Sequence, residues 1–341
     1  MTTFVLYEDR PEAEVGLRLA ICSLARHAPN SPIVCHKPWI SKGFDEWAKK
    51  FDQLIIVTER PKDAQGWNSK PNALIPVLEN GGEEAIWIDS DMLVTRDPRL
   101  LFRGVSRDTI GVTEEPFLVA CPNAAEQAMA WGWPPGRKLK TLINSSVVRV
   151  TGTHLPLLKR WREALMDPVY REYQKMPFDC RPRHMMSDQD VLFSLLGTRE
   201  YAEIPLKILY DGTDVLHCGG ALGYSFWRRL GDAFKPVPTF LHAIAGKPWW
   251  IFHPKYKECH TAYTVYYRRM LQEISPYTIE ARFYRELIGI PMPWLDQRTM
   301  FGLLFEYAGL RHHALMGLPV TTVATCISWA RQLQKPCRRL P

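Results

Sequence analysis

Apolar and polar positions alternate in blocks along the first part of the chain. Short apolar runs, each closed by polar or turn-forming residues, predict buried strands at residues 4–7, 32–35, 54–57 and 85–88. Apolar residues at helical spacing between these runs predict helices at residues 15–27, 44–51 and 70–78. Strands that alternate with helices indicate an α/β fold with a mostly parallel, doubly wound sheet.

The pattern continues less regularly and then changes. We predict further strands at residues 109–112, 145–150, 205–210 and 240–244, and helices at residues 154–166 and 187–196. From about residue 261 the strand signals stop, and the remainder is typical of helices interrupted by Pro276, Pro291, Pro293 and Pro319. The sequence therefore predicts an α/β domain over residues 1–260 and a helical region over residues 261–341.

Composition places the chain among ordinary globular proteins. Its 341 residues are 46% hydrophobic and 23% charged, which excludes disordered and fibrous classes. The eight cysteines form no C-x-x-C pair, and the first residues have no basic lead before Glu8 interrupts the apolar run. We therefore expect no signal peptide, reduced cysteines and a cytoplasmic location.

The net charge of +7 is concentrated at the end of the chain. After Glu306 there is no acidic residue, whereas Arg311, Arg331, Lys335, Arg338 and Arg339 supply five of the seven charges. A nearly neutral body argues against a nucleic-acid enzyme, in which basic residues would follow the active groove. A basic C-terminal tail is better suited to an anionic membrane surface.

The segment at residues 314–330 is uncharged but interrupted by Pro319 and polar residues. At 17 residues it is at the lower limit for spanning a bilayer and too polar to do so convincingly. With Trp329 and the basic residues behind it, it resembles an interfacial helix, so we expect peripheral attachment to the inner face of a membrane. The alternative is a helix packed on the catalytic domain.

The strongest local signal lies where the strand at residues 85–88 ends. Asp89 and Asp91 follow this apolar run directly, with Ser90 between them. In open α/β sheets, ligands bind at the carboxyl ends of the strands. Neighbouring carboxylates repel each other unless a cation or a proton lies between them, which favours Mg²⁺ or Mn²⁺ bridging to a substrate phosphate. The alternative is a solvated turn.

These residues are part of a series of motifs that resembles GT-A glycosyltransferases, most closely those of family 8. The D-x-D segment is followed by Asp97-Pro98, as in the metal-binding motif of that family. Four further segments occur in the family's order: Trp67-Asn68-Ser69-Lys70, Asn144-Ser145-Ser146-Val147-Val148, Ser187-Asp188-Gln189-Asp190 and His242 to Trp249 (HAIAGKPW). Two departures are visible: Ser145-Ser146 replaces Ala-Gly, and the spacing from His242 to Lys247 is one residue shorter than usual.

The resemblance implies a GT-A fold, mixed but mostly parallel, that binds a nucleotide-sugar donor, a UDP-sugar. It implies that Asp89, Asp91 and His242 hold Mn²⁺ or Mg²⁺, and that Asp188, Gln189 and Lys247 are the catalytic residues. It also implies a set of substrate-binding residues: Tyr7, Lys70, Ser90, Asn144, Asp188, Gln189, Gly246 and Lys247. The reaction implied is transfer of a hexose, with retention of configuration, to a carbohydrate or glycolipid acceptor such as a lipopolysaccharide.

Several alternatives remain open at this point. His217 competes with His242 as the third metal ligand. Asp188 and Asp190 could simply favour a helix dipole behind an N-cap at Ser187. Trp249 and Trp250 could form an acceptor face or pack in the core. The chain as a whole could be a haloacid-dehalogenase-type phosphatase, although that family carries its D-x-D on the first strand, or a non-catalytic binding protein with a GT-A-like fold.

Overall fold

A computed structural model describes residues 1–61, 66–117, 123–139, 141–218, 225–244, 247–252 and 262–333. Its main feature is a seven-stranded sheet with the order β3-β2-β1-β4-β7-β6-β8. These strands are β1 (Thr2–Tyr7), β2 (Ile33–His36), β3 (Leu54–Val57), β4 (Glu84–Ile88), β6 (Ile110–Glu114), β7 (Ile143–Thr151) and β8 (Leu206–Leu209). Only β7 runs antiparallel to its neighbours β4 and β6. The expected fold class, a mixed and mostly parallel α/β sheet, is confirmed.

A second, three-stranded sheet lies beside the first, and the sequence did not predict it. It consists of β5 (Met92–Val94), β10 (Phe240–His242) and β9 (Val215–His217), in that order. The predicted strand at residues 240–244 therefore belongs to this sheet and ends two residues early. The sheet matters for the site because β5 begins directly after Asp91 and β10 ends at His242.

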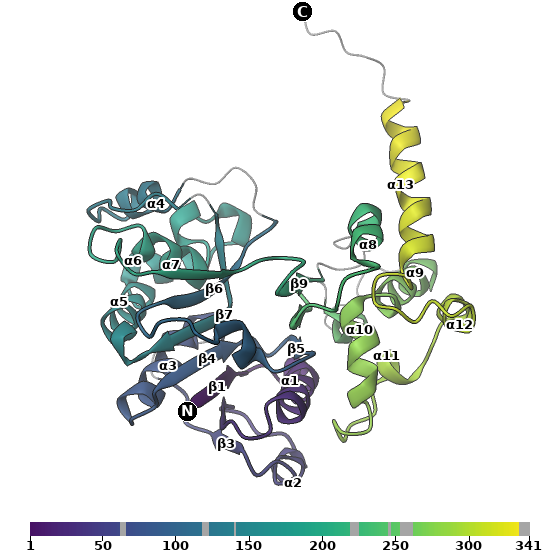
Figure 1. Ribbon diagram of the computed structural model, residues 1–341, viewed down its shortest axis with the longest axis horizontal. Coiled ribbons are helices and arrows are strands. Elements are labelled where there is room, and N and C mark those ends of the chain that lie inside the picture. Colours follow the sequence, from purple (N-terminus) through teal and green to yellow (C-terminus); the bar gives the residue numbers. More distant parts are fainter. Residues whose placement is uncertain are drawn as a thin grey trace, which may run out of the picture.

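Helices cover both faces of the main sheet (Figure 1). Along β1, Phe4 and Leu6 face one core, and Val5 and Tyr7 face the other, as the twofold repeat of a strand requires. The first core contains α1 (Glu14–His27) and α2 (Phe44–Ala48). The second contains α3 (Lys70–Glu79), α4 (Ala124–Ala130), α5 (Leu155–Leu165), α6 (Pro168–Gln174) and α7 (Asp188–Leu196).

The described residues from 262 onward are helical, as predicted. Their α-helices are α9 (Ala262–Glu273), α10 (Pro276–Ala281), α11 (Pro293–Asp296), α12 (Met300–Tyr307) and α13 (Leu318–Leu333), whereas α8 (Phe226–Asp232) lies earlier, between β9 and β10. Tyr277, Trp294 and Leu295 join the first core, so α10 and α11 pack against the α/β part. In Figure 1, α13 extends away from the body. Among the described residues, no helix is both long and apolar enough to cross a membrane.

Candidate active site

Three side chains of the kinds that bind divalent metals come together at the end of β4. Asp89 and Asp91 follow β4, and His242 is the last residue of β10. One ligand atom from each lies within 4.8 Å of the other two. The backbone N–H of Ala243 donates to the backbone oxygen of Asp91 at 3.0 Å, which holds the end of β10 beside the two aspartates. The structure thus brings together the three residues that the sequence suggested as metal ligands.

A second histidine fixes the protonation of His242. His217 Nε2 lies 3.0 Å from the backbone oxygen of Glu114, which only accepts, so this nitrogen carries the proton. Burial lowers the pKa of His217 to about 3, with the neighbouring His242 as a further cause, so the ring is neutral and its Nδ1 accepts. His242 Nδ1 lies 3.0 Å from that acceptor and therefore donates to it. His242 Nε2 consequently keeps its lone pair.

This lone pair faces a carboxylate. His242 Nε2 lies 3.3 Å from Asp91 Oδ1, and burial lowers the pKa of His242 to about 4, so the ring is neutral near pH 7. A neutral imidazole nitrogen and a carboxylate oxygen are both acceptors, and Mn²⁺ or Mg²⁺ accepts such ligands. The donor set fits a divalent cation better than it fits a hydrogen bond between the two groups. His217 lies behind His242 and is not in the ligand group.

Lys247 contacts the same carboxylate. Its Nζ donates to the Ala243 oxygen at 2.7 Å and forms an ion pair with Asp91. Burial, with Arg10 as a second cause, lowers the pKa of Lys247 to about 7, while Asp89 and Glu8 act in the opposite direction. At neutral pH the amine is therefore only partly protonated, and an anion that enters the site would raise its pKa and hold its positive charge.

Lys70 joins the D-x-D segment to the start of α7. Its buried Nζ lies 3.2 Å from Asp89 Oδ1 and 3.2 Å from Asp188 Oδ2. It also donates to Ser145 Oγ at 2.6 Å, and Ser145 donates to Asp188 at 2.7 Å. Burial alone would lower the pKa of Lys70, but the two aspartates outweigh it and raise the pKa. Lys70 therefore stays charged and holds two acids from separate elements together.

The residues expected to contact the donor sugar converge on a carboxylate that the sequence did not single out. Glu115 follows β6 and is buried. Its Oε2 accepts from Asn144 Nδ2 at 2.8 Å and from Gln189 Nε2 at 3.4 Å. A signal was available, because an acidic pair follows the predicted strand at residues 109–112, at the same edge of the sheet as Asp89. Glu115 thus orients two amide side chains toward one region.

Ser90 and Tyr7 both point into local hydrogen-bond networks. Ser90 Oγ donates to Glu8 Oε2 at 2.6 Å, and Arg10 pairs with the same carboxylate at 2.9 Å. The Tyr7 hydroxyl donates to Asp9 at 3.1 Å, and burial raises its pKa to about 12. Both residues lie at the strand ends where the sequence placed them.

Gly16 allows α1 to pack closely under this loop. A Cβ added there would lie 2.9 Å from the Ser90 oxygen and 2.7 Å from the Trp249 ring. Any larger side chain at this position would displace the segment that carries both aspartates. This requirement is not visible in the sequence, because it depends on a contact between distant segments.

The structure shows the surroundings of several residues whose roles the sequence left open. Trp249 packs in the first core, with ring contacts to Tyr277 and Trp294, so it does not form an open acceptor face. Asp190 accepts from the Ser187 hydroxyl at 2.7 Å, and burial raises its pKa to about 6. Ser187 occupies the N-cap of α7 but makes no capping hydrogen bond with its side chain. Gly246 lies outside the described residues.

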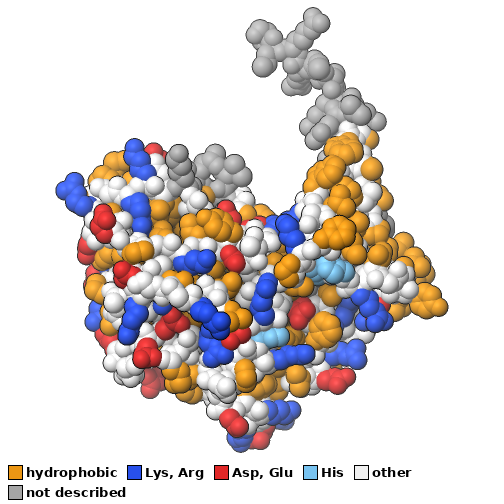
Figure 2. Space-filling view, in the orientation of Figure 1, with side chains coloured by type: hydrophobic (Ala, Val, Ile, Leu, Met, Phe, Trp, Pro, Cys, Tyr) orange, Lys and Arg blue, Asp and Glu red, His pale blue; other side chains and the backbone are white. Residues whose placement is uncertain are grey.

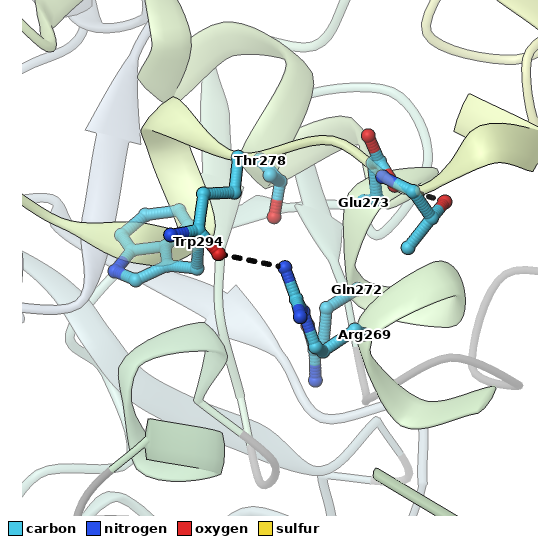
Figure 3. Close-up of a pocket in the computed structure, with 7 residues that line it drawn as sticks. Arg269, Gln272, Glu273, Thr278 and Trp294 are labelled. Carbon is cyan, nitrogen blue, oxygen red and sulfur yellow. Dashed lines mark hydrogen bonds between the residues drawn. The ribbon is translucent and has the colours of Figure 1, made fainter. Parts of the chain in front are cut away.

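A hollow in the helical part is too small for a substrate (Figure 3). It has a volume of about 10 Å³ and lies among Arg269, Gln272, Glu273, Thr278 and Trp294. A space of this size holds one water molecule. Arg269 donates across it to Gln297 at 3.1 Å, which is consistent with a structural role.

No family model and no curated protein matches the sequence. Among solved structures, the chain is similar to the glycosyltransferase GlyE of Streptococcus pneumoniae TIGR4, with 15% identity over 78% of this chain and 63% of that one, and a TM-score of 0.47. It is also similar to the galactosyltransferase LgtC in complex with donor and acceptor sugar analogues, with 15% identity, coverage of 86% and 99%, and a TM-score of 0.47.

A third similar structure is the bifunctional glycosyltransferase WbbM, with 13% identity over 73% of this chain and a TM-score of 0.47. The match covers 46% of WbbM and 63% of GlyE, so the chain spans less than two thirds of the length of either protein. All three structures are glycosyltransferases.

Proposed function

We propose that the chain is a metal-dependent glycosyltransferase that moves a hexose from a nucleotide-sugar, a UDP-sugar, to a hydroxyl of an acceptor. The observation that supports this most strongly is the group of Asp89, Asp91 and His242, whose ligand atoms lie within 4.8 Å at the carboxyl end of a central strand. Lys70 and Lys247, both buried, add positive charge at the same place. Such a site is suited to a diphosphate leaving group.

Each residue has a proposed role. Asp89, Asp91 and His242 would hold Mn²⁺ or Mg²⁺, which when bound supplies positive charge that stabilises the departing nucleotide diphosphate. Lys247 would add its own charge to that leaving group. Lys70 would hold Asp89 and Asp188 in place, because it lies 3.2 Å from each.

The donor sugar would lie beside Asp188, at the start of α7. Asp188, Gln189 and Asn144 would hydrogen-bond its hydroxyls, with Glu115 orienting the two amides. Tyr7, Ser90 and Gly246 complete the proposed substrate-binding set. The acceptor hydroxyl would then attack the anomeric carbon, with retention of configuration as in family 8.

The acceptor is proposed to be a glycolipid or lipopolysaccharide, reached from the inner face of an anionic membrane. The acid-free run after Glu306 supports this placement. Exposed apolar side chains of α13, including Val323, Ile327 and Trp329, support it as well. The proposed division into a catalytic domain at residues 1–260 and a basic helical region at residues 261–341 follows from the same asymmetry.

The experiment is a transfer assay with UDP-hexoses and a water-soluble acceptor. Asp89→Asn and Asp91→Asn should abolish Mn²⁺-dependent transfer with little change in thermal unfolding. Asp97→Asn is the matched control, because Asp97 belongs to the same segment but pairs with Arg99 outside the ligand group. Full transfer by either variant, or by the unaltered protein in excess chelator, contradicts the proposal. Rapid hydrolysis of simple phosphate esters would instead indicate a phosphatase.

A further inference from the structure

An open hollow in the helical part is large enough for a ligand, unlike the one in Figure 3. It has a volume of about 410 Å³ and lies between the segment after α10 and the segments on both sides of α12. Four arginines line it: Arg282, Arg285, Arg298 and Arg311. None of them belongs to the proposed active site, so this hollow, which we name the arginine pocket, needs a separate explanation.

The arginine pocket has more positive than negative charge. Its lining contains four guanidinium groups and two carboxylates, those of Glu286 and Glu306. Arg285 pairs with Glu286 at 3.5 Å, and Arg282 pairs with Glu273 at 3.3 Å, which leaves one positive charge in excess. Glu306 pairs with both Arg298 and Arg311, so a single carboxylate serves two guanidinium groups. The unmatched charge favours an anionic ligand, and the planar guanidinium is the group best suited to phosphate.

Arg282 provides an independent indication. Its side chain is only 10% exposed and lies 3.3 Å from Glu273, yet its Nε has no hydrogen-bond partner in the described part of the chain. A buried polar N–H without a partner is costly. Arg282 thus brings to the wall of the pocket a guanidinium group that Glu273 satisfies only in part.

The surroundings of the pocket are apolar and exposed. Met300, Leu303, Leu304 and Tyr307 repeat at helical spacing along α12 and are 72%, 53%, 57% and 95% exposed. Leu303 lies one turn before Glu306, on the side of α12 that borders the pocket. Phe283, which lines the pocket, is 66% exposed. Figure 2 shows orange side chains gathered over this outer end of the helical part, next to blue ones.

We propose that the arginine pocket binds the phosphate of an anionic phospholipid headgroup while the apolar stripe of α12 enters the membrane interface. A soluble anion would account for the arginines but not for the exposed stripe beside them. A purely apolar partner would account for the stripe but not for the unmatched charge. The inference rests on the proposed membrane location, and it assigns the lipid contact to residues upstream of the basic tail.

The test is co-sedimentation of the full chain with vesicles of phosphatidylglycerol and, separately, of phosphatidylcholine. Arg298→Gln should weaken binding to phosphatidylglycerol about fivefold, and Arg298→Gln/Arg311→Gln about 25-fold, since each basic residue near an anionic surface contributes similarly. Leu303→Ser/Tyr307→Ser should weaken binding at high as well as low salt, because it removes apolar contact rather than charge. Arg103→Gln is the matched control, because Arg103 is exposed and does not line the pocket.

Two results would overturn the proposal. In the first, the pocket and stripe variants bind phosphatidylglycerol vesicles as tightly as the unaltered protein, which would leave the tail as the membrane contact. In the second, glycerol phosphate binds the protein, Arg298→Gln abolishes this binding, and vesicles are not bound, which would indicate a site for a soluble anion.

A second readout separates this proposal from the proposed function. Transfer to a water-soluble acceptor should be unchanged in all pocket variants, because none of these residues lies at Asp89 or Asp91. Normal vesicle binding by a protein with no transfer activity would contradict the proposed function alone. Lost vesicle binding with normal transfer, confined to the pocket and stripe variants, supports the arginine pocket.

Discussion

Replacing His217 tests the hydrogen-bond chain behind the proposed metal site. His217→Phe keeps an aromatic ring of similar size but removes the nitrogen that accepts from His242 Nδ1 at 3.0 Å. Both histidines are buried, so water cannot easily replace the lost acceptor. The His242 ring can then move its proton to Nε2 and donate to Asp91, 3.3 Å away. A metal ion would have to displace that proton before it could bind.

The size of the effect follows from the geometry. Losing a partner that orients a metal-binding histidine typically lowers metal affinity 10- to 100-fold, or about 1.4–2.7 kcal/mol. The free energy of unfolding without metal should change less, because the new Nε2–H donates to Asp91 and remains satisfied. His217→Asn places an amide oxygen near the position of Nδ1 and should recover part of the affinity.

The assay is a titration with Mn²⁺ followed by electron paramagnetic resonance, which reports free Mn²⁺ without any need for turnover. ¹⁵N chemical shifts of the His242 ring in the metal-free protein should show the proton on Nδ1. His154→Phe removes another buried histidine, one that contacts Thr151 and Asp108, and serves as the control. Equal Mn²⁺ affinity in His217→Phe and the unaltered protein, or a proton on Nε2 of His242 in the latter, would refute the reasoning.

Three further predictions follow from the same contacts. Lys70→Met should lower the free energy of unfolding in urea by about 3–5 kcal/mol, because it leaves Asp188 buried without its cation; an unchanged value would show that the pair is not coupled. Asp188→Asn should reduce hexose transfer about 100-fold while leaving UDP affinity nearly unchanged; equal losses would place Asp188 in the nucleotide site or the fold. The metal-free protein should lose about 2 kcal/mol per histidine between pH 7 and pH 5, since His217 and His242, with pKa values of about 3 and 4, bind protons in that range only when unfolded. In His217→Phe the same urea titrations should show a shallower pH dependence, and an identical one would contradict the assignment.

The central parallel strands could be predicted from the sequence because they are buried on both faces. The runs at residues 4–7 and 85–88 are continuously apolar, and the helices between the strands carry helical spacing. The two aspartates at the end of β4 were visible for the same reason, since a polar pair that directly follows a buried strand stands out.

The second sheet could not be predicted in this way. β5 and β9 have three residues each, too few for a periodic signal, and they exist because β10 pairs with both of them. The helices α4, α6 and α8 have seven residues each and were missed for a similar reason. The predicted helix at residues 44–51 ends at Ala48, and Phe51 packs against Trp47 from the turn that follows.

The contacts that complete the candidate site depend on tertiary structure. His217 was considered as a metal ligand, but the register of β9 beside β10 places it behind His242 instead. Lys70 was expected to contact the donor, and the structure shows it between Asp89 and Asp188, which are 99 positions apart in the chain. Such roles follow from distances between separate elements, which no spacing along the sequence encodes.

The most direct test of the central claim is isothermal titration of the protein with UDP, in Mn²⁺ and in excess chelator. If Asp89, Asp91 and His242 hold the cation on the nucleotide diphosphate, the unaltered protein binds UDP in Mn²⁺ and loses this binding in chelator. Asp91→Asn should bind UDP weakly in both solutions. Equal UDP affinity with and without Mn²⁺, or no UDP binding in Mn²⁺, would contradict the claim that this group of residues is the metal centre of a UDP-sugar glycosyltransferase.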